Sequence, residues 1–151
     1  MNSSLCYIEN DNKFLMLYRN KKENDINEGK WIGVGGKFEV GESPEECMIR
    51  EIKEEAGISV KDYKLRGLIT FVCDDYPTEY MHLFWAKSDE KDVIECDEGE
   101  LKWIDKDKVL DLNIWEGDKI FLKELIENDK FFTLKLVYEN DKLVKCEKRY
   151  Y

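Results

Sequence analysis

Short runs of apolar residues, some alternating with polar ones, recur along the chain and predict β-strands. The predicted strands are residues 3–9, 13–20, 63–72, 79–87 and 100–105, followed by a terminal pair at 131–138 and 142–150. Turn-forming residues at 10–12 separate the first two runs, and the polar stretch 73–78 joins the next two as a hairpin. The terminal pair predicts another hairpin, with its turn at 139–141.

The segment that follows Ser43 has the start and stop signals of an α-helix. Ser43 is a favourable N-cap, Pro44 suits the first helical position, and Glu46 completes a capping box with Ser43. Gly57 supplies the C-terminal stop. These signals predict a helix that begins near Pro44 and ends near Ala56.

The rest of the pattern completes an α/β fold. A second amphipathic helix is predicted over residues 118–127 and one helical turn over 106–112. The polar stretch 20–30 predicts an irregular loop, and loops of this length in a compact domain more often have a function than not. The candidate core residues of the second helix are Ile120, Phe121, Leu122 and Leu125. Strands on both sides of the first helix, followed by the second helix, predict a mixed β-sheet between helices.

The first helix carries three carboxylates on one side. At about 100° per residue, Glu51, Glu54 and Glu55 fall on one face. The predicted apolar face consists of Ile49, Ile52 and Ala56, with Met48 between the two faces. Like charges at these spacings repel by a few tenths of a kcal/mol, roughly, per pair. One interpretation is a solvated acidic face, and the other is a site for a hard divalent cation such as Mg²⁺, which takes oxygen ligands.

Composition and charge narrow the class of protein. The 151 residues are 42% hydrophobic and 13% aromatic, which is typical of one globular domain over 1–151. The formal net charge of -10 argues against stable binding to nucleic acid or to an anionic membrane. An anionic substrate would need cations to approach such a protein.

Cysteine and histidine usage exclude several kinds of site. The five cysteines are odd in number and form no CxxC pair, which argues against a disulfide framework or a zinc site and favours a cytoplasmic protein. We expect neither a signal peptide nor a membrane segment, because no apolar run approaches 18 residues. His82, the only histidine, lies in a strand pattern that favours a structural role.

Nine positions between Gly36 and Ile58 fit the pattern G-x5-E-x7-R-E-U-x-E-E-x-G-U, where U is aliphatic. They are Gly36, Glu42, Arg50, Glu51, Ile52, Glu54, Glu55, Gly57 and Ile58. This stretch resembles the signature of the Nudix hydrolases. The resemblance implies a single Nudix domain over 1–151, with an α/β/α sandwich fold and the signature as a loop, a helix and a second loop.

The resemblance also implies a metal-dependent reaction. Nudix enzymes hydrolyse a nucleoside diphosphate linked to another group, with Mg²⁺ or Mn²⁺ bound. Glu51, Glu54 and Glu55 match the catalytic, metal-binding positions, and Glu51 is a candidate general base. The carbonyl group of Gly35 and a carboxylate of the acidic loop, Glu98 in preference to Glu100, are implied as further metal ligands.

Supporting and substrate-binding residues follow from the same match. Gly36, Glu42 and Arg50 match positions that orient the loop and the carboxylates. Lys37 and Arg19 are candidate substrate-binding residues, and Lys37 lies beside the cluster where phosphate would bind.

Substrate preference depends on residues outside the signature. The segments 29–37 and 113–118 and the acidic loop before Trp103 are similar to those of the MutT-like enzymes that hydrolyse oxidised purine nucleoside triphosphates. By this resemblance Trp115 stacks on a purine and Asp118 bonds its Watson–Crick edge. Trp115 has a second interpretation, as a core residue at a helix start.

Two residues depart from that subgroup. Ile32 stands where Asn often contacts the base, and Gly117 stands where an acidic residue is expected. The leading hypothesis is therefore a Mg²⁺-dependent pyrophosphohydrolase of oxidised or non-standard purine nucleotides such as 8-oxo-dGTP, acting as a monomer or homodimer. The alternatives are hydrolysis of ADP-ribose or a capped RNA end, and a non-catalytic nucleotide-binding regulator.

Overall fold

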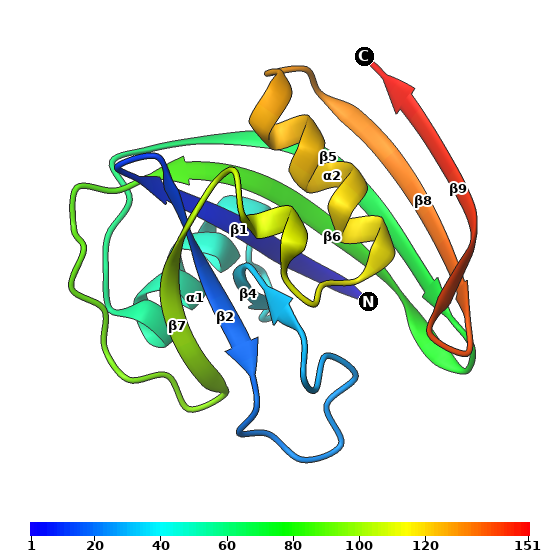
Figure 1. The fold of residues 1–151 in the computed structure, drawn as a ribbon, viewed down its shortest axis with the longest axis horizontal. Helices are drawn as coiled ribbons and strands as arrows, with labels where there is room; N and C mark the ends of the chain where they lie inside the picture. Colours follow the sequence, from blue (N-terminus) through cyan, green and yellow to red (C-terminus); the bar gives the residue numbers. More distant parts are fainter.

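Nine strands form one mixed β-sheet in the computed structural model, which describes residues 1–151 (Figure 1). The strands are β1 (Asn2–Asn10), β2 (Lys13–Arg19), β3 (Trp31–Ile32), β4 (Val34–Lys37), β5 (Asp62–Cys73), β6 (Tyr76–Lys87), β7 (Gly99–Asp105), β8 (Phe132–Glu139) and β9 (Lys142–Tyr150). The helices are α1 (Pro44–Ala56), α2 (Glu116–Glu127) and the short 3-10 helix η1 (Val109–Asp111).

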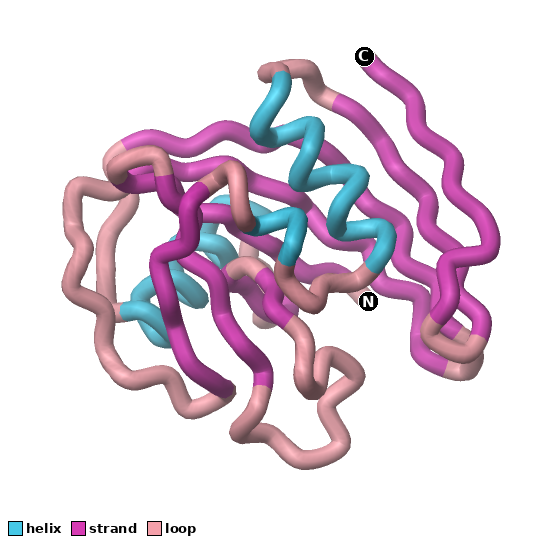
Figure 2. The backbone as a smooth tube through the Cα atoms, viewed as in Figure 1, coloured by secondary structure: helices cyan, strands magenta, loops and turns pink.

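The sheet is mixed because two of its strand pairs are parallel. The strand order is β3-β2-β1-β6-β5-β8-β9, with β4 also paired to β1 and β7 to β2. β1 pairs with β6 in parallel, and β5 pairs with β8 in parallel, whereas the other pairs are antiparallel. Figure 2 shows that the chain contains much more strand than helix and that α2 lies across the sheet.

Alternate residues of β1 serve two core layers, one against each helix. Cys6 and Ile8 belong to the layer that contains Met48 of α1, whereas Tyr7 belongs to the layer that contains Phe121 of α2. The rings of Tyr7 and Phe121 have centroids 5.9 Å apart. This alternation is the two-residue period of a strand that is covered on both faces. The predicted mixed sheet between helices is thus confirmed, with α1 behind the sheet and α2 in front of it in Figure 1.

Helix α1 has the predicted bounds and caps. The hydroxyl of Ser43 accepts from the N–H of Glu46 at 3.1 Å, and the carboxylate of Glu46 accepts from the N–H of Ser43 at 2.9 Å. Gly57 ends the helix with φ of 73°, the left-handed conformation that glycine adopts without strain. The helix therefore presents its carboxylates at a fixed angle to the sheet.

The predicted apolar face of α1 was wrong at Ile49. Ile49 is 47% exposed, whereas Met48 and Ile52 are buried against the sheet. Met48, Ile52 and Glu55 share a face because they are spaced by four and three residues. The buried stripe therefore includes Glu55, which the sequence pattern places on the acidic face of the helix.

Some element boundaries also differ from prediction. The β5–β6 hairpin turns at residues 74 and 75 alone, because Cys73 already pairs with Tyr76, where a link over 73–78 was predicted. Helix α2 begins at Glu116, two residues before the predicted start, and η1 falls within the predicted helical turn. Neither α-helix is long and apolar enough to cross a membrane.

Candidate active site

A cavity of about 620 Å³ brings together residues from β1, β4, α1, β6, the loop 20–30 and the start of α2. Most of the predicted site residues line it: Arg19, Gly35, Gly36, Lys37, Arg50, Glu51, Glu55, Glu98, Trp115 and Asp118. Glu42 and Glu54 do not line it. The cavity has a carboxylate end, formed by α1 and Glu98, and a second end, formed by Trp115 and Asp118.

Glu55 is the most deeply buried member of the carboxylate end. Glu55 is 8% exposed, and its Oε2 atom is buried without a hydrogen-bond partner. Burial, together with the neighbouring charges of Glu98 and Glu51, raises the pKa of Glu55 to about 9. Burial also raises the pKa of Glu51. Three carboxylates thus crowd a site in which water cannot fully solvate their charges.

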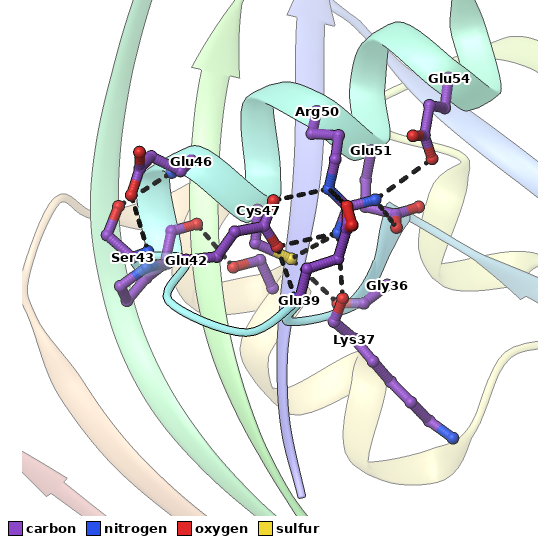
Figure 3. A network of polar contacts seen from close by, with 12 residues as sticks. Gly36, Lys37, Glu39, Glu42, Ser43, Glu46, Cys47, Arg50, Glu51 and Glu54 are labelled. Carbon is purple, nitrogen blue, oxygen red and sulfur yellow. Dashed lines mark hydrogen bonds and ion pairs between the residues drawn. The ribbon is translucent and has the colours of Figure 1, made fainter.

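Arg50 organises the signature loop from the outer side of this cluster (Figure 3). Its guanidinium donates to both oxygens of Glu42, at 2.6 and 2.9 Å, and to the carbonyl of Lys37 at 3.1 Å. It also donates to Glu51 at 2.7 Å. The Arg50 guanidinium lowers the pKa of Glu42 to about 2. Glu42 in turn accepts from the backbone N–H of Glu39, so the loop is tied to the helix.

The two glycines of β4 permit close approaches that no other residue allows. A Cβ on Gly35 would stand 1.9 Å from the carbonyl oxygen of Ser4 in β1. A Cβ on Gly36 would stand 2.5 Å from the carboxylate carbon of Glu51. Gly36 therefore leaves the space that the carboxylate of Glu51 occupies.

The chemistry of this end fits a divalent cation. Its donors are carboxylate oxygens, the ligands that Mg²⁺ and Mn²⁺ prefer, and one of them is orphaned in the interior. The side chains do not surround a common point as a ready coordination shell. Glu51 and Glu54 instead bond to Arg50, at 2.7 and 3.2 Å. Arg50 bonds to Oε1 of Glu51, so Oε2 of the same carboxylate would remain for a cation.

Glu54 and Lys37 lie at the rim of the site. The side chain of Glu54 is 60% exposed and contacts Arg50 only at 3.2 Å. Figure 3 shows the side chain of Lys37 extending away from the carboxylates. The metal-binding role of Glu54 and the phosphate-binding role of Lys37 stay predictions.

Arg19 and Glu98 meet at the inner side of the cluster. The guanidinium of Arg19 donates to Glu98 at 2.9 Å and to Asp25 at 2.7 Å, and the side chain of Arg19 is only 9% exposed. Lys22 lies 3.8 Å from Glu98 on the exposed side. Glu98, and not Glu100, lines the cavity, and two carboxylates already engage Arg19.

Trp115 and Asp118 form the second end of the cavity. Trp115 is 4% exposed and packs edgewise on Phe71 and Tyr138, with ring centroids 5.4 and 4.9 Å away. The core interpretation of Trp115 is thus realised, while its ring also lines the cavity. Burial raises the pKa of Asp118 to about 8, although Lys30 acts in the opposite direction.

The two departures from the purine pattern have different causes. Ile32 lines the cavity and presents an apolar side chain to it. Gly117 is required by packing, since a Cβ there would stand 2.5 Å from Leu136 Cδ1 and 2.6 Å from the hydroxyl of Tyr138. That hydroxyl also accepts from the N–H of Gly117 at 2.7 Å. An acidic side chain at position 117 would not fit this contact.

Sequence reasoning missed three acidic residues of the cavity, which are Asp25, Glu39 and Glu79. Asp25 comes from the polar loop 20–30, and its side chain is 6% exposed. Glu79 accepts from the hydroxyls of Ser3 at 2.5 Å and Tyr76 at 3.2 Å. The only available signal was an acid beside apolar residues in a loop or hairpin. His82 bonds to the carbonyl of Ser3 at 3.0 Å, in keeping with a structural role.

The comparisons with known proteins agree with this geometry. A family model of the NUDIX domain matches residues 2–125, so the chain belongs to the Nudix family and is a hydrolase of phosphorus-containing acid anhydrides. The uncharacterized Nudix hydrolase YvcI of Bacillus subtilis (strain 168) is 34% identical over 119 residues, which span 75% of this chain and 71% of that protein.

The chain is also similar to a purine nucleotide hydrolase and to a solved MutT structure. The oxidized purine nucleoside triphosphate hydrolase of Danio rerio is 33% identical over 112 residues, 73% of this chain and 71% of that one. The crystal structure of the mutator MutT protein from Bacillus halodurans superposes with a TM-score of 0.86 at 29% identity, covering 97% of this chain and 96% of that chain.

Proposed function

We propose that this protein is a Mg²⁺-dependent nucleoside triphosphate pyrophosphohydrolase that acts on oxidised or non-standard purine nucleotides such as 8-oxo-dGTP. The products would be the nucleoside monophosphate and pyrophosphate. The observation that carries the proposal is one cavity with a carboxylate cluster at one end and a buried Trp115–Asp118 pair at the other. The name of the Danio rerio relative, an oxidized purine nucleoside triphosphate hydrolase, supports the same substrate class.

The carboxylate end would receive the phosphates. Glu51, Glu55 and Glu98 would hold the cation, with Glu54 joining them from the rim. A bound divalent cation neutralises phosphate charge and lowers the pKa of a bound water. Glu51 is the candidate base for that water, since Gly36 leaves room for its carboxylate and Arg50 orients it.

The other end would receive the base. With a pKa of about 8, Asp118 is mostly protonated at pH 7, so it offers one hydrogen-bond donor and one acceptor. A purine Watson–Crick edge also presents donors and acceptors side by side. Trp115 and Phe71 supply the aromatic surface next to Asp118. Ile32 adds an apolar wall that cannot form a hydrogen bond, so base selectivity rests mainly on Asp118.

Product identity tests the reaction. Purified protein would be incubated with 8-oxo-dGTP and Mg²⁺, and the products would be separated by anion-exchange chromatography. The proposal predicts monophosphate and pyrophosphate in equal amounts, with no turnover in EDTA. A Glu55→Gln variant is the matched control, and it should bind nucleotide but release almost no product. Release of the nucleoside diphosphate and inorganic phosphate would contradict the proposal, as would turnover in EDTA. Nucleotide binding without turnover by the wild type would instead favour a regulator.

A further inference from the structure

The loop of residues 20–30 is closed at its base by Arg19, the last residue of β2. The N–H of Arg19 donates to the carbonyl of Lys30 at 3.0 Å, and the carbonyl of Arg19 accepts from the N–H of Gly29 at 2.8 Å. The backbone of Arg19 is therefore tied to both residues at the end of the loop. Its side chain then points into the cavity that the loop helps to line.

The side chain of Arg19 begins a continuous polar chain through this loop. Glu98 and Asp25 both accept from its guanidinium, at 2.9 and 2.7 Å. The second oxygen of Asp25 accepts from the N–H of Asn27 at 3.1 Å, and the side-chain oxygen of Asn27 accepts from the indole N–H of Trp115 at 2.8 Å. The chain links the carboxylate end of the cavity to its aromatic end.

Charge balance explains why an arginine can stand beside a cation site. Glu98 and Glu55 repel each other, and a side chain as exposed as that of Glu98, at 31%, could turn to solvent. Arg19 holds Glu98 in place by a charge-assisted hydrogen bond. Asp25, with its side chain 6% exposed, balances the charge of Arg19. Glu98 is thereby oriented while its own negative charge stays available to a cation.

We propose that Arg19 and Asp25 are positioning residues that hold Glu98 beside Glu55 for cation binding, and that Asp25 also places Asn27 against Trp115. The inference rests on the proposed function, because it takes Glu98 as a cation ligand. Partners behind metal ligands typically contribute about 10–100-fold to metal affinity. Arg19 thus acts through Glu98, and the loop 20–30 organises both ends of the cavity.

The direction in which cation affinity changes in an Arg19→Met variant separates a positioning role from a simple electrostatic one. Arg19→Met removes a positive charge close to the cation site. Charge alone predicts tighter cation binding in this variant. Positioning predicts weaker binding, by about tenfold or more, because Glu98 loses the partner that aims it. Lys22→Met is the matched control, since Lys22 also lies near Glu98 but is 56% exposed and 3.8 Å away.

The experiment is a titration of nucleotide-free protein with Mn²⁺, followed by the electron paramagnetic resonance signal of the free ion. We expect weaker binding by Arg19→Met and Asp25→Asn, and equal or tighter binding by Lys22→Met. Arg19→Lys keeps the charge but has no planar fork to bridge two carboxylates, so it should also bind more weakly. Thermal unfolding would identify any variant that fails to fold, in which case Arg19→Lys and Asp25→Asn carry the test.

The outcomes distinguish this inference from the proposed function. Equal or tighter Mn²⁺ binding by folded Arg19→Met would overturn the positioning role alone. Unchanged binding by Glu98→Gln would overturn it as well, because Glu98 would then not be a ligand. A wild type that binds no Mn²⁺ would overturn the proposed function together with this inference.

The end of the cavity formed by Trp115 and Asp118 is tested separately, by nucleotide binding without metal. Asn27→Ala removes the acceptor for the indole of Trp115 but leaves Arg19 and Glu98 paired. We expect its Mn²⁺ affinity to match the wild type and its affinity for 8-oxo-dGMP without metal to fall several-fold, by roughly the value of one hydrogen bond. Asp25→Asn should weaken both the binding of Mn²⁺ and the binding of 8-oxo-dGMP. Unchanged 8-oxo-dGMP binding by both variants would overturn the link to Trp115.

Discussion

Gly36 lies directly against the carboxylate of Glu51. A Cβ at Gly36 would stand 2.5 Å from the carboxylate carbon of Glu51 and within 2.7 Å of both oxygens. The guanidinium of Arg50 donates to the same carboxylate at 2.7 Å. The glycine and the arginine together define where the candidate base can stand.

Gly36→Ala should therefore damage catalysis more than folding. The added methyl group must displace Glu51, and a misplacement of about 1 Å can cost roughly a hundredfold in rate. The measurement is kcat with Mg²⁺ beside thermal unfolding. Gly41→Ala is the control, since Gly41 has φ of 81° but no atom within 4 Å of a built Cβ. It should lose about 1 kcal/mol of stability and keep its activity. Near-normal turnover by Gly36→Ala would contradict the assigned role of Glu51.

Glu54→Gln and Glu55→Gln should each lower turnover by orders of magnitude with little loss of stability. The side chain of Glu54 is exposed, so its replacement changes the free energy of unfolding by about 0.5 kcal/mol or less. Glu55 is buried with a raised pKa, so an uncharged amide is tolerated there at neutral pH. Steady-state kcat and urea unfolding without metal measure the two effects. Near-full activity in either variant would show that its metal assignment is wrong.

Asp118 should make the protein less stable as pH rises. Its pKa of about 8 in the folded state exceeds the value of about 4 for an unfolded aspartate. The folded state therefore holds a proton that the unfolded state releases. The resulting stabilisation is fully present below about pH 4 and is lost progressively as the pH rises to about 8. Through that window, stability should fall by up to about 1.4 kcal/mol per pH unit from this group.

Asp118→Asn tests the sign, because the amide does not titrate. The difference in unfolding free energy, variant minus wild type, should grow from pH 5 to pH 8 and level off above. Urea unfolding at fixed pH steps measures it. A difference that stays flat, or that shrinks with pH, would mean that Asp118 is ionised in the folded protein.

Arg66 should be important for stability and not for catalysis. It is 3% exposed, and its guanidinium donates to the carbonyls of Glu124 and Lys130, both at 3.1 Å, at the end of α2. Arg66→Met leaves these buried acceptors unpaired and should cost about 2–4 kcal/mol. Lys64→Met is the control, because Lys64 donates to the carbonyl of Asp129 from an exposed position and should cost about 0.5 kcal/mol or less. If both variants lost the same free energy of unfolding in urea, the buried hydrogen bonds of Arg66 would not have the stabilising role given to them here.

Local signals made α1 predictable, and tertiary packing decided the rest. The capping box of Ser43 and Glu46 and the stop at Gly57 act within a few residues, so the helix bounds follow from sequence. Ile49 fits the apolar period but faces away from the sheet, because α1 packs through Met48 and Ile52. The parallel pairing of β1 with β6 joins segments far apart in the chain, and no local pattern specifies it.

The residues of the candidate site also fall into those that local sequence predicts and those that tertiary contacts bring in. The signature identifies Glu51 and Glu55 because its spacing lies within one helix. Asp25 and Glu79 reach the cavity from a loop and a hairpin, through contacts with residues distant in sequence. The pairing of Arg19 with Glu98 likewise requires β2 and the acidic loop to meet.

The central claim is tested most directly by kcat/KM values with Mg²⁺ over a panel of substrates. The panel contains 8-oxo-dGTP, 2-oxo-dATP, dGTP, dATP, dCTP, ADP-ribose and a dinucleoside polyphosphate. An oxidised purine should exceed its unmodified counterpart by about tenfold or more, which corresponds to one well-formed hydrogen bond to Asp118. A lead for ADP-ribose or for an ordinary nucleotide would contradict the proposal. Ile32 and Gly117 would then mark a different substrate, and Trp115 would be a packing residue only.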